Sequence, residues 1–287
     1  MVMKFDFSYL ELVYDVISGN KDVVDIIKTK TYEAIKSHGE NSFGGHNNII
    51  KAINSINDGE PNKLAKHLLD NKEKIFNLVK TFKEREEEFI TTIIKNVKNI
   101  YPYGDFRNIT IFLIVGYDAI GYRGDVICSI DFNFVLEDYR ELVSLLIHET
   151  AHVIHAQYCS AINNITLKKE DIKETLNMLI QSEGIAIFSA YNYRRTMGIL
   201  DNKDGIIRED YINTIEKELI LREAYRDTMK YIKENKSINI ILNRFFTVRV
   251  DHALGFIIFE NMYKDFGIDI IREMALIKNS DFVKLYL

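Results

Sequence analysis

Apolar residues recur at intervals of three and four along most of this chain, which is the spacing of amphipathic helices. The clearest case is 71–100, where apolar side chains form one stripe and the charged cluster KEREEE faces away from it. The first hundred residues therefore predict helices, with one long helix over 71–100. The first helix is expected to begin with a capping box of Ser8 and Glu11 and to end at Gly19, and Pro61 suits the first turn of a later helix.

The spacing changes after Pro102. Residues 109–117 and 125–134 are rich in isoleucine, valine and phenylalanine, which predicts two strands joined by the segment DAIGYRG. No phosphate-binding glycine motif occurs there. The predicted fold class is α+β, predominantly α-helical, with a small antiparallel sheet. Helical spacing then resumes and predicts helices at 138–160, 171–197, 208–235, 249–264 and 268–278.

Composition excludes several classes of protein. A hydrophobic content of 47% fits a soluble globular chain, and a net charge of −5 gives no electrostatic basis for binding nucleic acid or an anionic membrane. Cys128 and Cys159 form no CxxC pair, so neither a disulfide framework nor a cysteine-built zinc site is expected. The start is acidic and no run reaches the roughly 18 apolar residues of a membrane span. These features predict a cytoplasmic protein.

One apolar helix carries titratable groups where leucine or valine would be expected. In LVSLLIHETAHVIHAQY (142–158), the residues His148, Glu149 and His152 spell H-E-x-x-H. Helical residues four apart lie about 40° apart and one turn along, so both imidazoles can bind one ion. Glu149 is close enough to take a proton from metal-bound water without ligating the metal. The motif predicts a zinc site with His148 and His152 as ligands and Glu149 as general base.

A catalytic zinc needs a third protein ligand. His155 lies roughly 10 Å along the helix from His148, too far for both to bind one ion, and is expected to be a packed or supporting histidine. Glu183 is the better candidate, because an acidic group among apolar residues is costly unless it is paired or bound to a metal. Gly184 and Ala186 beside it would let this helix approach the first one closely.

The string HETAH, followed on the next helix by SEGIA, resembles the gluzincin group of zinc metallopeptidases. It is most similar to the poorly characterised predicted zinc-dependent proteases whose glutamate ligand lies in an E-G-x-A string. The resemblance implies one Zn²⁺ held by His148, His152 and Glu183, and a peptide or protein substrate. The thermolysin-like pattern has an aspartate four residues after the glutamate ligand, where this chain has Ile187. The carboxylate that orients a zinc histidine must then come from elsewhere or be missing.

The resemblance implies a two-strand element before the metal helix, which 109–134 supplies, and a helical lobe that closes the cleft; together with the helical spacing of the first hundred residues, this predicts three parts of the chain. A helical N-terminal lobe would cover 1–104, a zincin-like metal-binding core 105–200, and a helical C-terminal lobe closing the cleft 201–287. Related enzymes take a donor for the reaction's oxyanion from that last lobe. The segment 248–267 offers His252 first and Arg249 second, three residues apart on one face of the predicted helix.

Several alternatives stay open. His252 could instead pack at a helix start beside Asp251, and Tyr191 and Tyr193 are weaker oxyanion candidates. Glu149 and His152 also form the E-x-x-H unit of di-iron bundles, but such bundles need two and no second one occurs. The remaining histidines have no partner at ligand spacing and are expected in loops or at the surface: His38, His46 and His67.

The function predicted is a zinc-dependent peptide-bond hydrolase that uses a zinc-activated water. The alternative is a non-catalytic, zinc-stabilised helical protein that binds peptides or partners, although a structural site has no use for a base such as Glu149. An extended peptide could bind by strand addition if 125–134 is an edge strand. The sequence does not distinguish endopeptidase from exopeptidase action, and it leaves the oligomeric state open.

Overall fold

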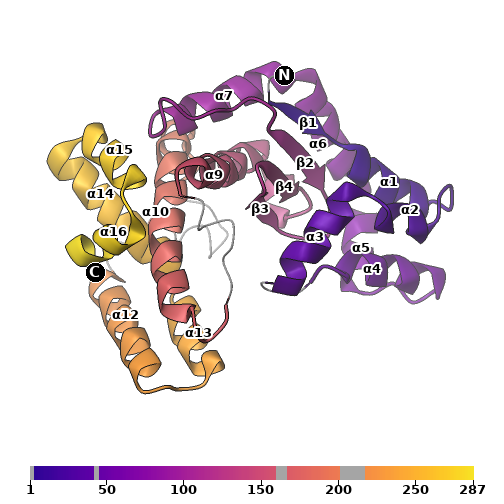
Figure 1. The fold of residues 1–287 in the computed structure, drawn as a ribbon. Helices are drawn as coiled ribbons and strands as arrows, with labels where there is room; N and C mark the ends of the chain where they lie inside the picture. The colour runs from indigo at the N-terminus through magenta and orange to yellow at the C-terminus, as the bar shows by residue number, and fades with distance from the viewer. Residues whose placement is uncertain (1–2, 42–44, 160–166, 201–216) are drawn as a thin grey trace. The chain divides into compact units, whose positions relative to one another are not determined.

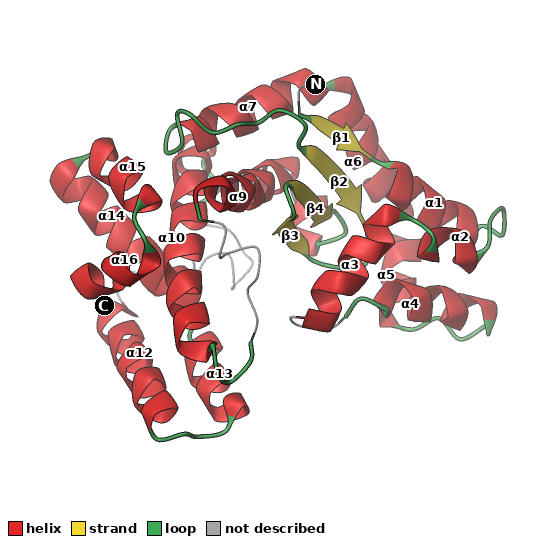
Figure 2. Cartoon of the chain, viewed as in Figure 1, coloured by secondary structure: helices red, strands yellow, loops and turns green. Residues whose placement is uncertain are grey.

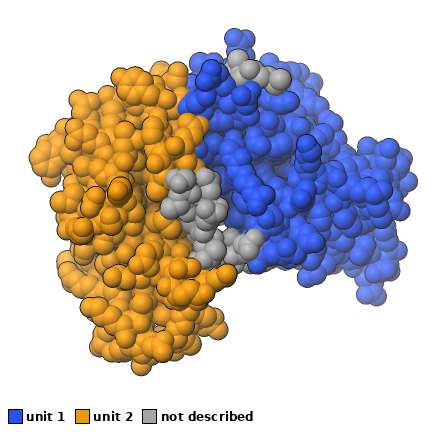
Figure 3. All heavy atoms as spheres, in the orientation of Figure 1, with its two compact units in different colours: residues 1–94, 105–153 blue, residues 95–104, 154–287 orange. Residues whose placement is uncertain are grey.

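The computed structural model describes residues 3–41, 45–159, 167–200 and 217–287, and the chain divides into two compact units (Figure 3). Unit 1 comprises Met1–Ile94 and Asp105–Val153, and unit 2 comprises Lys95–Gly104 and Ile154–Leu287. The described strands all lie in unit 1, whereas the described elements of unit 2 are helical (Figure 2). The α+β class and the predominance of helix are confirmed.

Unit 1 surrounds a four-stranded sheet with short helices (Figure 1). Its helices are α1 (Ser8–Ile17), α2 (Val23–Ile27), α3 (Lys30–Asn41), α4 (Asn48–Asn57), α5 (Lys63–Asp70), α6 (Lys72–Glu84) and α8 (Asn133–Glu137), with most of α7 (Glu86–Lys98) and α9 (Tyr139–Tyr158).

The sheet is mixed, so the prediction of an antiparallel sheet is wrong. The strands lie in the order β1-β2-β4-β3; β1 pairs with β2 and β2 with β4 in parallel, and only β3 and β4 are antiparallel. Local spacing cannot reveal this pairing, because β1 joins the sheet through a contact about a hundred residues away along the chain. Ile111, Leu113 and Val126 are fully buried in its core. The strands are β1 (Lys4–Asp6), β2 (Thr110–Ile114), β3 (Ala119–Tyr122) and β4 (Asp125–Ser129).

The segment DAIGYRG forms strand β3 and a tight hairpin turn. Arg123 and Gly124 both have positive φ angles, 50° and 91°, as a two-residue type I′ turn requires. β3 therefore folds back onto β4 and becomes the end strand of the sheet. The condition for strand addition at 125–134, an edge position, is not met: β4 is an interior strand, and α8 begins within that range.

Two helix boundaries in unit 1 also differ from the predictions. Residues 71–100 form two helices, α6 and α7, because Arg85 leaves the helical conformation (φ −119°, ψ 25°). The break lies between Phe82 and Phe89, whose ring centroids are 4.3 Å apart. Ser8 does not cap α1: its hydroxyl donates to Asp6 Oδ1 at 2.6 Å, so the expected capping box is not formed.

Unit 2 is built around the 26-residue helix α10. Residues 185–188 are at most 2% exposed, and four consecutive helical residues span a whole turn, so α10 is covered on every side there. Figure 1 shows α14, α15 and α16 grouped beside it. The elements are α10 (Ile172–Met197), α12 (Glu218–Lys233), α13 (Ile238–Phe246), the π-helical turn η3 (Val250–Leu254), α14 (Gly255–Phe266), α15 (Ile268–Leu276) and α16 (Asn279–Tyr286).

Residues 208–216, the start of the helix predicted over 208–235, lie outside the described residues. The helix predicted over 249–264 is not regular. Arg249 is left-handed (φ 56°, ψ 48°), the π-helical turn η3 follows, and α-helical geometry begins only at Gly255.

Candidate functional site

The H-E-x-x-H motif lies in the middle of α9, a helix of 20 residues. Asp138 stabilises its start by accepting the backbone N–H of Arg140 at 3.0 Å. His148 and His152 project from successive turns, with their Nε2 atoms 3.0 Å apart. The two ring nitrogens thus converge, as the spacing of four residues predicts.

Glu149 lies next to this pair and is shielded from water. Its side chain is only 7% exposed, and its Oε1 lies 3.9 Å from His148 Nε2. Because a carboxylate is costly to bury without partners, placing one beside two imidazoles is typical of a reactive or metal-binding site rather than of a packing core.

Strand β3 lies directly against the motif. A Cβ atom on Gly121 would be 2.8 Å from the backbone oxygen of Glu149 and 3.0 Å from Cβ of His152. Such contacts leave no room for a side chain, so only glycine lets the strand approach this turn of α9. The end strand of the sheet and the motif are therefore positioned together within unit 1.

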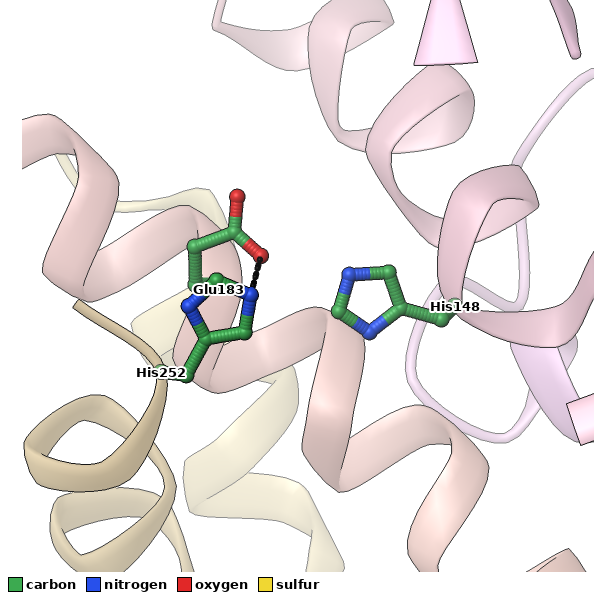
Figure 4. A group of neighbouring side chains, drawn as sticks. All are labelled: His148, Glu183 and His252. Atoms are coloured by element: carbon green, nitrogen blue, oxygen red, sulfur yellow. Dashed lines mark ion pairs between the residues drawn. The ribbon is translucent and has the colours of Figure 1, made fainter. Parts of the chain in front are cut away.

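In unit 2, Glu183 and His252 are neighbours. Glu183 lies on α10, His252 lies on η3, and Glu183 Oε2 is 3.3 Å from His252 Nε2 (Figure 4). Both side chains are partly exposed, at 16% and 23%. A carboxylate and an imidazole are here presented together at an accessible position, which suits ligands or proton carriers.

The other ring nitrogen of His252 also has a carboxylate neighbour. His252 Nδ1 lies 2.9 Å from Oδ2 of Asp251, whose side chain is 7% exposed. His252 therefore lies beside Asp251, as the predicted alternative has it, and also contacts Glu183. The two ring nitrogens of His252 thus face different carboxylates, Nδ1 that of Asp251 and Nε2 that of Glu183.

Arg249 stands out by its backbone. Its φ of 56° is in the left-handed region, which is uncommon for a residue other than glycine. The π-helical turn follows immediately, so Arg249 and His252 do not share the regular helix face that the sequence predicts. Conformations of this kind are often retained at functional sites.

Other histidines pack within their own unit. His155 is 2% exposed, and its ring stacks on Tyr101 with centroids 6.1 Å apart, which agrees with the expected packed histidine. The prediction of loop or surface positions is wrong for His38 and His67. They lie on α3 and α5 and contact the hydroxyl of Tyr117 at 2.8 Å and the backbone oxygen of Asp131 at 2.6 Å, respectively.

The predicted site residues thus form two groups, one in each unit. His148, Glu149 and His152 are together in unit 1, and Glu183 and His252 are together in unit 2. Figure 4 draws three of these side chains, His148, Glu183 and His252, each of which offers one atom that could ligate a metal. Imidazole nitrogen and carboxylate oxygen are the donors that zinc accepts in catalytic sites, so the residue types fit a zinc ion.

Ile187 stands where the thermolysin-like pattern has an aspartate, four residues after Glu183. Ile187 is 1% exposed in the core around α10, so no carboxylate is available at that place on the helix. Asp251, on η3, is a carboxylate that does lie beside a histidine ring nitrogen in this unit. The sequence already places Asp251 next to His252, and the π-helical turn that carries both residues brings the carboxylate to Nδ1.

Comparison with protein families gives one match. The sequence matches the family described as "Putative zinc dependent peptidase (DUF5700)" over residues 25–287. The chain belongs to this family. The match covers all the site residues named above and confirms the resemblance to zinc metallopeptidases. At that general level the family supports a zinc-dependent peptidase, a hydrolase that acts on peptides or proteins.

No curated protein and no solved structure matches the chain. Among the described helices, none combines the length and apolar character that crossing a membrane requires.

Proposed function

We propose that this DUF5700 member hydrolyses peptide bonds as a gluzincin-like metalloprotease. One zinc ion would be bound by His148, His152 and Glu183, with Glu149 as general base. In this proposal the sheet and α9 form a zincin-like core. The observation that carries it is the pair of converging imidazoles with a buried carboxylate beside them, in a family described as zinc dependent.

The proposed ligands have the right chemistry for the ion. When bound, zinc supplies a water whose pKa falls to about 7, and it polarises the scissile carbonyl. Binding through imidazole requires neutral rings, so the ligands bind best at and above neutral pH.

Glu149 is the proposed general base, and then the general acid, of the reaction. Its carboxylate accepts a proton from the attacking water and passes it to the nitrogen of the leaving amine, so the base ends each turnover in its starting state. A positioned acid–base group of this kind contributes roughly 10²–10⁴-fold to the rate. Its burial keeps bulk water from competing for the proton.

His252 is the proposed donor to the oxyanion. A protonated imidazole carries a donor on both nitrogens: Nδ1 lies beside the carboxylate of Asp251, and Nε2 would donate to a substrate oxygen. Arg249 is the second candidate, since its fixed cationic charge stabilises an anion without a proton transfer. Removing one such donor costs about 10²–10³-fold in turnover in comparable sites.

The end strand β3 is the proposed docking edge for an extended peptide. It pairs with β4 on one side, and Gly121 brings it against the turn of α9 that carries Glu149. Strand addition at this edge would hold the peptide backbone next to the general base. We assign peptide binding to β3 and not to β4 (125–129), because β4 is an interior strand of the sheet.

Peptide cleavage with a base-deficient variant tests the proposal. Zinc-loaded protein is incubated with a peptide library and the products are read by mass spectrometry, alongside Glu149→Gln. The variant is expected to retain one equivalent of zinc and to lose at least 10²-fold in cleavage rate. Glu137→Gln, an exposed residue at the end of α8, makes the same charge change away from the motif and should cleave normally.

Two results would contradict the mechanism. Cleavage that persists in Glu149→Gln would remove the proposed base. Zinc binding without cleavage of any peptide would instead favour the alternative, a non-catalytic zinc-stabilised protein that binds peptides or partners.

A further inference from the structure

The hydrogen-bonding pattern of β3 shows which of its backbone groups are available. The backbone N–H of Ser129 donates to the carbonyl oxygen of Asp118 at 3.0 Å, so residue 118 faces β4. Backbone groups alternate along an antiparallel strand, and residues 120 and 122 therefore face β4 as well. Ala119 and Gly121 direct their N–H and C=O groups to the other side, where the sheet has no further strand among the described residues.

One of these outward groups is already occupied by a side chain. Asp118 Oδ1 accepts the backbone N–H of Ala119 at 2.9 Å. A pairing peptide can therefore use the C=O of Ala119 and both backbone groups of Gly121, and beyond them it meets the carboxylate of Asp118. Three strand residues span about 10 Å, so this carboxylate lies about three peptide positions from the residue opposite Gly121.

Asp118 presents a carboxylate at the N-terminal end of strand β3. The residue is exposed, and within the described ranges it makes no ion pair with lysine or arginine. The titratable groups near it include the buried thiol of Cys128, whose pKa burial raises, and His38 and Tyr117, which contact each other. Burial lowers the pKa of His38, an effect that Asp118 opposes, and burial raises the pKa of Tyr117 to about 12. Both are thus neutral at pH 7, and the negative charge remains available to a ligand.

We infer that the site selects extended peptides carrying a lysine or arginine, whose side-chain cation pairs with Asp118 about three positions from the residue opposite Gly121. This inference rests on the proposed function, because it takes β3 as the docking edge. An exposed ion pair contributes modestly, so the expected preference for the basic peptide is about fivefold.

Binding to the Glu149→Gln protein measures the preference without turnover. Fluorescent peptides of one extended sequence carry a single lysine moved along the chain, and each is paired with a peptide that has uncharged norleucine at the same place. Anisotropy titrations give the Kd values. One lysine position is expected to bind about fivefold more tightly than its norleucine partner, and 0.5 M salt is expected to reduce that difference.

Asp118→Asn in the same background identifies the residue responsible. Asparagine keeps an oxygen for the N–H of Ala119 and removes the charge, so the lysine peptide should lose its advantage over norleucine. Asp58→Asn is the matched control. It removes the same charge from an exposed position at the end of α4, and the preference should persist.

Equal binding of lysine and norleucine peptides at every position would overturn the inference, as would a preference that survives Asp118→Asn. The proposed function fails separately. Selective binding of lysine peptides by a protein that cleaves none would leave this inference standing and remove the peptidase mechanism, whereas cleavage without any basic preference would do the reverse.

Discussion

Gly184 and Gly255 lie backbone against backbone where α10 meets the start of α14. A Cβ on Gly184 would be 2.6 Å from Cα of Gly255, and a Cβ on Gly255 would be 2.8 Å from Cα of Gly184. Glu183 directly precedes one glycine and His252 lies three residues before the other. The glycines therefore set the distance between these two side chains.

A methyl group at this contact should separate the two helices. For Gly255→Ala we expect a loss of about 1–3 kcal/mol in the free energy of unfolding, because the obstructing atoms belong to the backbone and cannot rotate away. The Glu183–His252 contact should open at the same time, and zinc affinity should fall about 10-fold or more. Thermal unfolding and competition with a zinc indicator give the two quantities.

Phe188→Leu is a control that distinguishes a general loss of stability from a change in the Glu183–His252 contact. Phe188 is buried on α10, and its ring centroid lies 5.4 Å from that of Tyr263 on α14, so its truncation should cost about 1 kcal/mol or more at the same helix pair without placing an atom between the glycine backbones. Unchanged zinc affinity in Gly255→Ala, or an equal loss in Phe188→Leu, would show that the glycines do not position the site.

Asp251→Asn tests how His252 is oriented. The amide cannot stabilise a protonated ring as the carboxylate does, so we expect kcat to fall about 10-fold or more while bound zinc stays at one equivalent. Steady-state kinetics and metal analysis measure both. Asp265→Asn, exposed on α14, is the control, and an equal effect of the two substitutions would argue against a positioning role.

Gly121→Ala tests the contact between β3 and α9. The new methyl would meet the backbone of Glu149, so we expect a loss of about 1–3 kcal/mol in unit 1 and a raised KM for extended peptides. Hydrogen exchange locates the loss of stability, and kinetics give KM. Ala119→Gly loosens the same strand without a clash; a KM increase of the same size there would assign the effect to strand flexibility.

Unit 1 should lose stability as the pH falls below about 6.5. Burial lowers the pKa of His38 below its usual value of 6.5, so the unfolded chain binds a proton there before the folded chain does. This contribution is complete above pH 6.5 and is lost as the pH falls toward the folded pKa. Metal-free unfolding between pH 5 and 8 measures it.

His38→Asn should flatten that part of the pH dependence. The amide can still bond the hydroxyl of Tyr117, which contacts His38 at 2.8 Å, but it does not titrate. An unchanged profile in the variant would assign the pH dependence to other groups.

Local patterns predicted the helical character of the chain well and its sheet less well. The 3.6-residue period of α9 and α10 depends only on residues that are close together in the sequence. Both helices therefore begin and end within two residues of the predicted positions. β1 is only three residues long and carries no period of its own. The turn at Arg123 and Gly124 begins with a residue that does not usually adopt positive φ, so the hairpin had a weak local signal.

The sequence by itself determined that two imidazoles and a carboxylate converge on α9, because a helix converts a spacing of four residues into adjacency. It also indicated Glu183 through the cost of an acidic group among apolar residues. The tertiary structure alone decided that His252 contacts Glu183, that β3 rather than β4 ends the sheet, and that glycines permit both close approaches. These relationships join residues far apart in the chain, and only the packing of one element on another fixes them.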